Sequence, residues 1–132
     1  MWQNPVYDRT LFDVQAKTAK AYINTADLNR IENNMLYMSQ LLNCTVETKQ
    51  WADGEFVYIA DLERLKANLQ ILTDTYKLTP KSPNIPTLPY NLYSQWNDIE
   101  KIIYDLYSLF YANKEAVFYC GEAYAGSQIG VI

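Results

Sequence analysis

The sequence predicts a mainly α fold: a compact bundle of three longer amphipathic helices, preceded by a short helix and followed by a short extended tail. Three observations predict it. Apolar residues recur at helical spacing in three stretches that begin near residues 26, 60 and 94, a fixed step of 34. A shorter stretch with a helix-start signal precedes them, and glycines beside aromatic residues follow them. With 132 residues, the chain can bury the core of one domain.

The short helix is expected just after Thr10. Thr10 and Asp13 stand three residues apart and resemble a capping box, in which each side chain bonds the backbone N–H of the other residue. A break is expected near Asn24. Four apolar residues of this region would face inward: Leu11, Val14, Ala21 and Tyr22.

The three longer helices are pseudo-repeats, and their apolar residues are spaced 3, 4, 3, 4, which is typical of one buried helical stripe. The repeats lie near residues 26–42, 60–76 and 94–110. Their stripes are Leu28, Ile31, Met35, Met38 and Leu42, then Leu62, Leu65, Leu69, Leu72 and Tyr76, then Trp96, Ile99, Ile103, Leu106 and Phe110. We therefore expect helices near 26–43, 60–77 and 94–114 that pack into one domain, residues 1–116.

Start signals differ among the three helices. Asn24 stands three residues before Asp27 at the first helix, and Ser94 can cap the third through its hydroxyl. The second helix has no evident cap.

Two charge pairs repeat at the same place in the first two helices. Asp27 with Arg30, and Asp61 with Arg64, stand at i and i+3, within reach of an ion pair. An ion pair at the helix start is the ordinary explanation. The sharper hypothesis is that these four residues dock a partner.

The two connections between the longer helices differ in composition. Residues 43–59 alternate around Val46 and contain one glycine, Gly54, so that a short strand and an extended loop both fit. The second connection has prolines at strict intervals of three: Pro80, Pro83, Pro86 and Pro89. That interval is the period of a polyproline II helix. It indicates either a ligand for a proline-binding domain or, as the favoured interpretation, a stiff spacer lying across the bundle.

Residues 117–132 form the predicted tail, where helical spacing stops. Aromatic residues beside glycines favour extended structure with tight turns, and an apolar end needs a surface to cover it. The tail could pack on its own domain or add to a neighbouring subunit, and we favour the neighbour. Its expected contact residues are Phe118, Tyr119, Tyr124 and Ile129.

Composition argues against several classes of function. The formal charge of −4 argues against nucleic acid. No apolar run approaches the roughly 18 residues of a membrane span, and the first residues lack the order of a signal peptide. We therefore expect a soluble protein that is made and used without secretion. Twelve tyrosines suit a protein interface, although they could equally fill a small helical core.

The residue types also argue against an enzyme, a metal site and a cofactor. The chain has no histidine and two cysteines, Cys44 and Cys120, too few for a tetrahedral zinc site. We expect buried or idle thiols rather than a disulfide. Asp98 and Asp105 share a helix face and could act as acid and base. Both lie off the apolar stripe, where solvated surface charge is the ordinary explanation.

Several motifs stand in order along nearly the whole chain. They read YDRTLFDVQ, KAYINTADLNRIENNMLYM, a connector led by Trp51, ADLERLKAN, TPKSP, then Asn97 with Ile99 and Glu100, and finally FYCGEAYAG. This order resembles a family of minor structural proteins from phages and prophages of Gram-positive, Firmicutes-type bacteria. The family shows DRT-x-x-DV, K-x-Y-N-x-x-DLNRIE-x-N, DL-x-R-x-x-x-N, TP-x-x-P, N-x-IE and FY-x-GE-x-Y-x-G in the same order.

The resemblance implies a place in the virion tail, at the baseplate or the attachment of fibres, with host cytoplasm as the site of assembly. It implies contacts with other tail or baseplate proteins, and no catalytic residue. Tail symmetry favours three or six copies by analogy. Two alternatives remain open: a free adaptor or regulator that docks a partner through the proline spacer or a tyrosine-rich face, and a cryptic lytic enzyme, such as a wall hydrolase accessory.

Overall fold

The computed structural model describes residues 2–18, 20 and 22–123, with side chains as far as residue 113. Four helices lie in this part of the chain: α1 (Leu11–Ala16), α2 (Thr25–Leu42), α3 (Ile59–Thr75) and α4 (Tyr93–Ala123). No strand occurs among the described residues, and the three longer helices pack against one another. The prediction of a mainly α bundle is confirmed.

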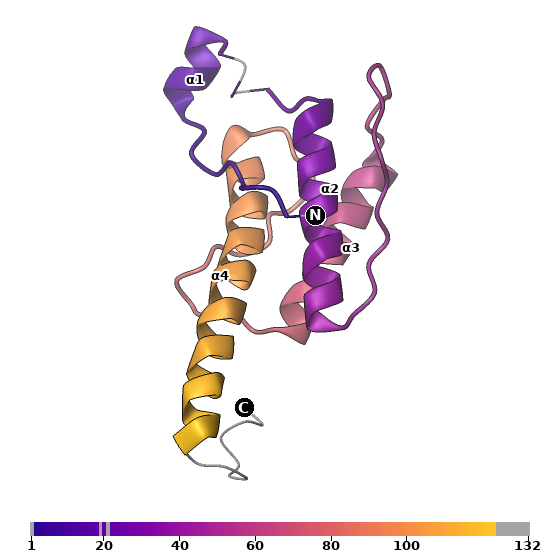
Figure 1. Ribbon diagram of the computed structural model, residues 1–132. Coiled ribbons are helices and arrows are strands. Elements are labelled where there is room, and N and C mark those ends of the chain that lie inside the picture. Colours follow the sequence, from indigo (N-terminus) through magenta and orange to yellow (C-terminus); the bar gives the residue numbers. More distant parts are fainter. Residues whose placement is uncertain (1, 19, 21, 124–132) are drawn as a thin grey trace.

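The three longer helices run in the same direction (Figure 1). Arg30 contacts Glu100, and seven residues later Tyr37 contacts Tyr111, so α2 and α4 are parallel. Extended chain returns to the starting end between them, as the α2–α3 connector (residues 43–58) and the α3–α4 connector (residues 76–92). The step of 34 residues is therefore the length of one helix and one returning connector.

The core follows the predicted stripes. Eleven of their residues are buried: Leu28, Ile31, Met35, Met38, Leu65, Leu69, Leu72, Trp96, Ile99, Ile103 and Leu106. The other four, Leu42, Leu62, Tyr76 and Phe110, pack half-buried against the cluster. The α3–α4 connector adds Tyr90, and the α2–α3 connector adds Trp51. The helical spacing therefore predicted the inward faces of all three helices.

Two predicted helix starts are confirmed. At α1, the Thr10 hydroxyl accepts from Asp13 N–H while Asp13 accepts from Thr10 N–H. At α2, Asn24 and Asp27 make the same reciprocal pair, at 2.9 and 3.0 Å. Each pair satisfies two backbone N–H groups at its helix start.

The other two starts are capped by residues further into the helix. At α3, no side chain of the preceding residue caps the helix, and Asp61 accepts from Tyr58 N–H. The prediction of Ser94 as a cap is wrong because α4 already begins at Tyr93. Gln95 accepts there instead, from the N–H groups that precede the helix.

The inward face predicted for α1 is also wrong. Leu11 is 55% exposed and Tyr22 54%, and Val14 is exposed as well. Ala21 lies outside the described residues. The helix spans six residues and buries none of them. In so short a helix, apolar spacing cannot separate a core face from a solvent face, because one turn leaves no period to measure.

The predicted extended tail begins too early. Helix α4 continues through Ala116 to Ala123, so residues 117–123 are helical and place Phe118 and Tyr119 in the helix. Good helix formers such as Glu115 and Ala116 lead into this stretch, and Gly121 costs a helix only about 1 kcal/mol. Residues 124–132, with Tyr124 and Ile129, lie outside the described part of the chain.

Both connectors are irregular. The α2–α3 connector is an extended loop, and of the two predicted alternatives no strand is present within it. In the α3–α4 connector, a turn closed by a hydrogen bond from Ser82 N–H to the Thr79 carbonyl interrupts the proline series. A polyproline II helix has no internal hydrogen bonds, so the four prolines do not form one continuous helix of that kind.

Candidate functional site

Glu100 on α4 is the centre of a buried ion cluster. Its carboxylate is 1% exposed and accepts from Arg9 Nη2 at 2.8 Å and from Arg30 Nε at 2.7 Å. The N–H of Val6 donates to it as well, at 3.0 Å. Asp27 accepts from Arg30 at 2.8 Å. We call these five residues the Glu100 cluster, and it joins the N-terminal segment (residues 2–9), α2 and α4.

Glu32 on α2 is the centre of an equivalent cluster. It accepts from the indole Nε1 of Trp51 at 2.8 Å and from both terminal nitrogens of Arg64 at 2.6 Å. Asp61 lies 3.8 Å from the same guanidinium. These four residues form the Glu32 cluster, which joins α2, α3 and the α2–α3 connector.

Both arginines are held as cations. Burial acts to lower the pKa of Arg30, but hydrogen bonds to Glu100 and Asp27 and the charge of these carboxylates outweigh burial and raise it. The pKa of Arg64 is raised chiefly by its hydrogen bonds to Glu32. A buried ion pair of this kind stabilises the fold only while both partners remain, because a lone buried charge is costly.

Four asparagines hold extended chain by two hydrogen bonds each. In every case the side-chain carbonyl accepts from one residue's N–H, and the side-chain NH₂ donates to the carbonyl of that same residue, at 2.6–3.3 Å. The amide thus pairs with the peptide as a neighbouring strand would. The pairs are Asn34 with Gln3, Asn97 with Arg9, Asn68 with Glu47, and Asn29 with Trp51.

These contacts follow the 34-residue repeat. Arg30 and Asn34 correspond to Arg64 and Asn68 one repeat later, and Asn29 and Glu32 correspond to Asn97 and Glu100 two repeats later. Each arginine binds the glutamate of another repeat, and each asparagine binds a residue of the N-terminal segment or of the α2–α3 connector. The repeat therefore encodes interhelical contacts as well as helix faces.

The third groove, between α3 and α4, lacks this set. The positions that would supply it hold Glu63, Lys66, Asp98 and Ile102. None of these residues has a hydrogen bond or ion pair to the α3–α4 connector within the described part of the chain. The connector in this groove must therefore be held by other contacts.

The predicted docking charges lie inside the two clusters. Asp27, Arg30, Asp61 and Arg64 pair within the chain, as the ordinary explanation expects. A docking role for them stays a prediction. Their glutamate partners were missed in the sequence, although Glu32 and Glu100 stand 68 residues apart, two repeats, which is a usable signal.

A second feature is a set of exposed apolar side chains on α1 and around the starts of α2, α3 and α4, segments that lie at one end of the bundle (Figure 1). Phe12 on α1 is 71% exposed, and Phe56 just before α3 is 76% exposed. We call this surface the apolar end. It consists of Leu11, Phe12, Val14, Tyr22, Phe56, Val57, Tyr58, Ile59 and Leu92. Four of these residues, Phe56 to Ile59, are consecutive, and contiguous exposure of this kind marks interaction sites more often than scattered apolar residues do.

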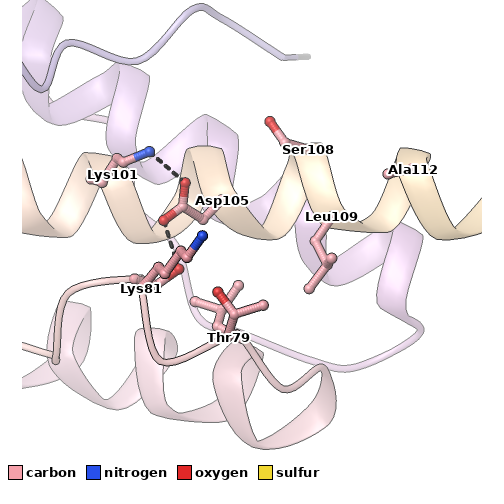
Figure 2. Close-up of a pocket in the computed structure, with 9 residues that line it drawn as sticks. Thr79, Lys81, Lys101, Asp105, Ser108, Leu109 and Ala112 are labelled. Atoms are coloured by element: carbon pink, nitrogen blue, oxygen red, sulfur yellow. Dashed lines mark hydrogen bonds and ion pairs between the residues drawn. The ribbon is translucent and has the colours of Figure 1, made fainter.

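A third feature is a cavity of about 340 Å³ between the α3–α4 connector and α4 (Figure 2). Asp105 stands in its wall and accepts from Lys101 Nζ and from the Ser82 hydroxyl, both at 2.7 Å. The bond to Asp105 raises the pKa of Lys101. The ammonium group of Lys81 also lines the cavity and has no ion-pair partner among the described residues.

A metal-ligand cluster and a membrane-spanning helix are both absent from the described residues. No group of three His, Cys, Asp or Glu is placed there to hold a metal ion. None of the described helices combines the length and apolarity needed to cross a membrane. Comparison of the chain with family models, with curated proteins and with solved structures finds no match.

Proposed function

We propose that this chain is a non-enzymatic structural component of a bacteriophage virion, in the tail, at the baseplate or the attachment of fibres. It joins other tail or baseplate proteins through protein–protein contacts, in a homo-oligomer of three or six copies, and assembles in the host cytoplasm. The order of motifs along the chain supports the phage assignment.

The observation that carries the contact role is the apolar end. Phe56, Val57, Tyr58 and Ile59 are four consecutive exposed apolar residues, and α1, which carries the exposed Phe12, lies at the same end of the bundle (Figure 1). Exposing such side chains to water is unfavourable unless a partner covers them, by roughly 25 cal/mol per Å² of apolar surface. Aromatic residues are also enriched in the contacts that dominate binding.

Incorporation into particles tests this role. The double variant Phe12→Ser, Phe56→Ser changes two exposed side chains and should keep the helical circular dichroism and the thermal midpoint. It should be absent from purified particles when they are analysed by mass spectrometry. Ile71→Ser, on α3 and away from the apolar end, is the control and should incorporate normally. Normal incorporation of the double variant would remove the apolar end from the assembly contacts.

Residues 117–132 are the second contact we propose, with Phe118, Tyr119, Tyr124 and Ile129 facing a neighbouring subunit. Deleting them should leave the bundle folded, because the described core ends at Phe110. The truncated chain should fail to enter particles. If it unfolds instead, these residues belong to their own domain.

The cavity beside the α3–α4 connector favours one alternative, a free adaptor that docks a partner there or on a tyrosine-rich face. Neighbouring genes separate the two proposals, since genes for tail proteins cluster. Catalysis by Glu100 or Asp105 is not part of either proposal, because both carboxylates are held by intramolecular hydrogen bonds. Degradation of peptidoglycan by the purified chain, lost in Asp105→Asn, would overturn this.

A further inference from the structure

The α3–α4 connector leaves open space on both of its sides. Between residues 77 and 86, the described chain makes one hydrogen bond to a helix, from Ser82 to Asp105. The cavity toward α4 lies on one side of this stretch, and a second hollow, lined by Gln70, Thr73 and Pro83, lies toward α3. Leu78 and Ile85 hold the connector by packing half-buried on the core.

The lining of the cavity toward α4 is partly apolar and partly charged. Leu78, Leu109 and Ala112 form an apolar wall. The lining also includes two lysines, Lys81 and Lys101, of which Lys101 is paired with Asp105. Figure 2 shows Lys81 extending from the connector toward α4, on the side of Asp105. The cavity therefore offers one unpaired positive charge beside an apolar surface.

The size of the cavity limits what it can hold. A volume of about 340 Å³ is at the low end of the roughly 300–1,000 Å³ typical of ligand pockets. It suits one or two side chains of a peptide rather than a large cofactor. In the other two grooves of the bundle, extended chain is the natural occupant, held by Asn34, Asn68 and their counterparts.

We propose that this cavity binds an acidic side chain from an extended segment of a partner protein. The carboxylate of that side chain pairs with Lys81, and the hydroxyl of Thr79, which lines the same cavity, is a further donor. An apolar neighbour in the segment packs on Leu109 and Ala112. The site is separate from the apolar end and does not depend on a virion role.

A peptide titration tests the proposal on the full chain. The probe is acetyl-Leu-Glu-Leu-amide, and acetyl-Leu-Gln-Leu-amide is its uncharged match. Amide NMR shifts should change at residues 78–82 and 105–112, and the Gln peptide should bind about fivefold more weakly because it lacks the charge-assisted bond. Acetate and inorganic phosphate are added separately as anions without an apolar part, and neither should bind at the peptide's concentration.

Three variants locate the site. Lys81→Gln should weaken the Glu peptide about fivefold and leave the Gln peptide unchanged. Ala112→Leu, an exposed helical position, should block both peptides by filling the apolar side while the circular dichroism stays the same. Lys77→Gln makes the same charge change outside the cavity, where Lys77 is 80% exposed, and should have no effect.

Several outcomes would overturn the proposal: no binding at millimolar peptide, equal affinity for the two peptides, or an equal loss in Lys77→Gln and Lys81→Gln. Shifts centred outside the cavity would overturn it too. If acetate or phosphate binds as well as the Glu peptide, the cavity is an anion site and the peptide assignment is wrong. Particle incorporation of the apolar-end variants is measured independently, so failure here leaves the proposed function standing.

Discussion

The N-terminal segment and the α2–α3 connector are held by side chains that bond their backbone, whereas residues 77–86 of the α3–α4 connector are held mainly by apolar contacts. Asn34 and Asn68 each hold the backbone N–H and C=O of one residue of their segments by two hydrogen bonds. In the third groove, Ile102 occupies the corresponding position and is buried in the core. Hydrogen bonds from the asparagines fix which residue of the extended segment lies beside which residue of the helix. Apolar packing is less specific and tolerates the hollows on both sides of residues 77–86.

The largest effect on stability is expected at Glu100, which holds the N-terminal segment by its ion pair with Arg9. Glu100→Gln keeps the shape of the side chain but leaves Arg9 and Arg30 with only Asp27 as a nearby anion. Breaking a buried ion pair costs about 3–5 kcal/mol, so the free energy of unfolding should fall by about 3 kcal/mol. Urea denaturation followed by circular dichroism measures this.

Glu63→Gln is the matched control, since Glu63 is exposed and has no partner within the described residues. Its free energy of unfolding should change by less than about 0.5 kcal/mol. A similarly small change in Glu100→Gln would mean that the Glu100 cluster contributes no more than a surface ion pair.

The second prediction compares the two asparagines that repeat directly. Asn34→Ala and Asn68→Ala should each cost about 1–3 kcal/mol, because each leaves a peptide N–H and C=O without their partners. The two costs should be similar, since both side chains are buried and make the same pair of bonds. Asn33→Ala, beside Asn34 but partly exposed and bonded only to the side chain of Gln50, should cost under about 0.5 kcal/mol. If the two variants lost unequal free energies of unfolding, the N-terminal segment and the α2–α3 connector would not be held equally strongly.

These contacts show which features of the fold the sequence predicts and which it does not. The stripes and the Thr10 and Asn24 helix starts depend on residues three or four apart, and local spacing predicted them. The bond between Asn97 and Arg9 joins residues 88 apart, and no local period reveals it. Only the repeat gives a signal, because Asn29 and Asn97 are equivalent. The length of α4 was underestimated since glycine and aromatic residues lower helix propensity only slightly.

The third prediction concerns the one hydrogen bond that ties residues 77–86 to a helix. Ser82→Ala should cost about 0.5–1 kcal/mol, less than either asparagine change, because the bond to Asp105 is half-exposed and neutral on one side. Hydrogen exchange should become faster at residues 79–83 and stay unchanged at residues 44–51. If exchange became equally faster in both connectors, the two would open together, and the α2–α3 connector would not be held independently by its asparagines.

The smallest effect is expected at Asp98, which occupies in α4 the repeat position of Arg30 and Arg64. It has no cation to pair with among the described residues, and burial raises its pKa above the ordinary 3.8. The folded state therefore binds a proton on Asp98 more readily than the unfolded state does. Protonated Asp98 thus contributes to stability, and this contribution is lost as the pH rises through the pKa of Asp98 in the folded state. Asp98→Asn should be slightly more stable than the parent at pH 7, and the difference should disappear below pH 3.8, where Asp98 is itself uncharged. Denaturation midpoints at both values of pH measure this, with exposed Asp53→Asn as the control. If the variant is less stable at pH 7, Asp98 does have a cationic partner. The groove between α3 and α4 would then be held by an ion pair, as the other two grooves are.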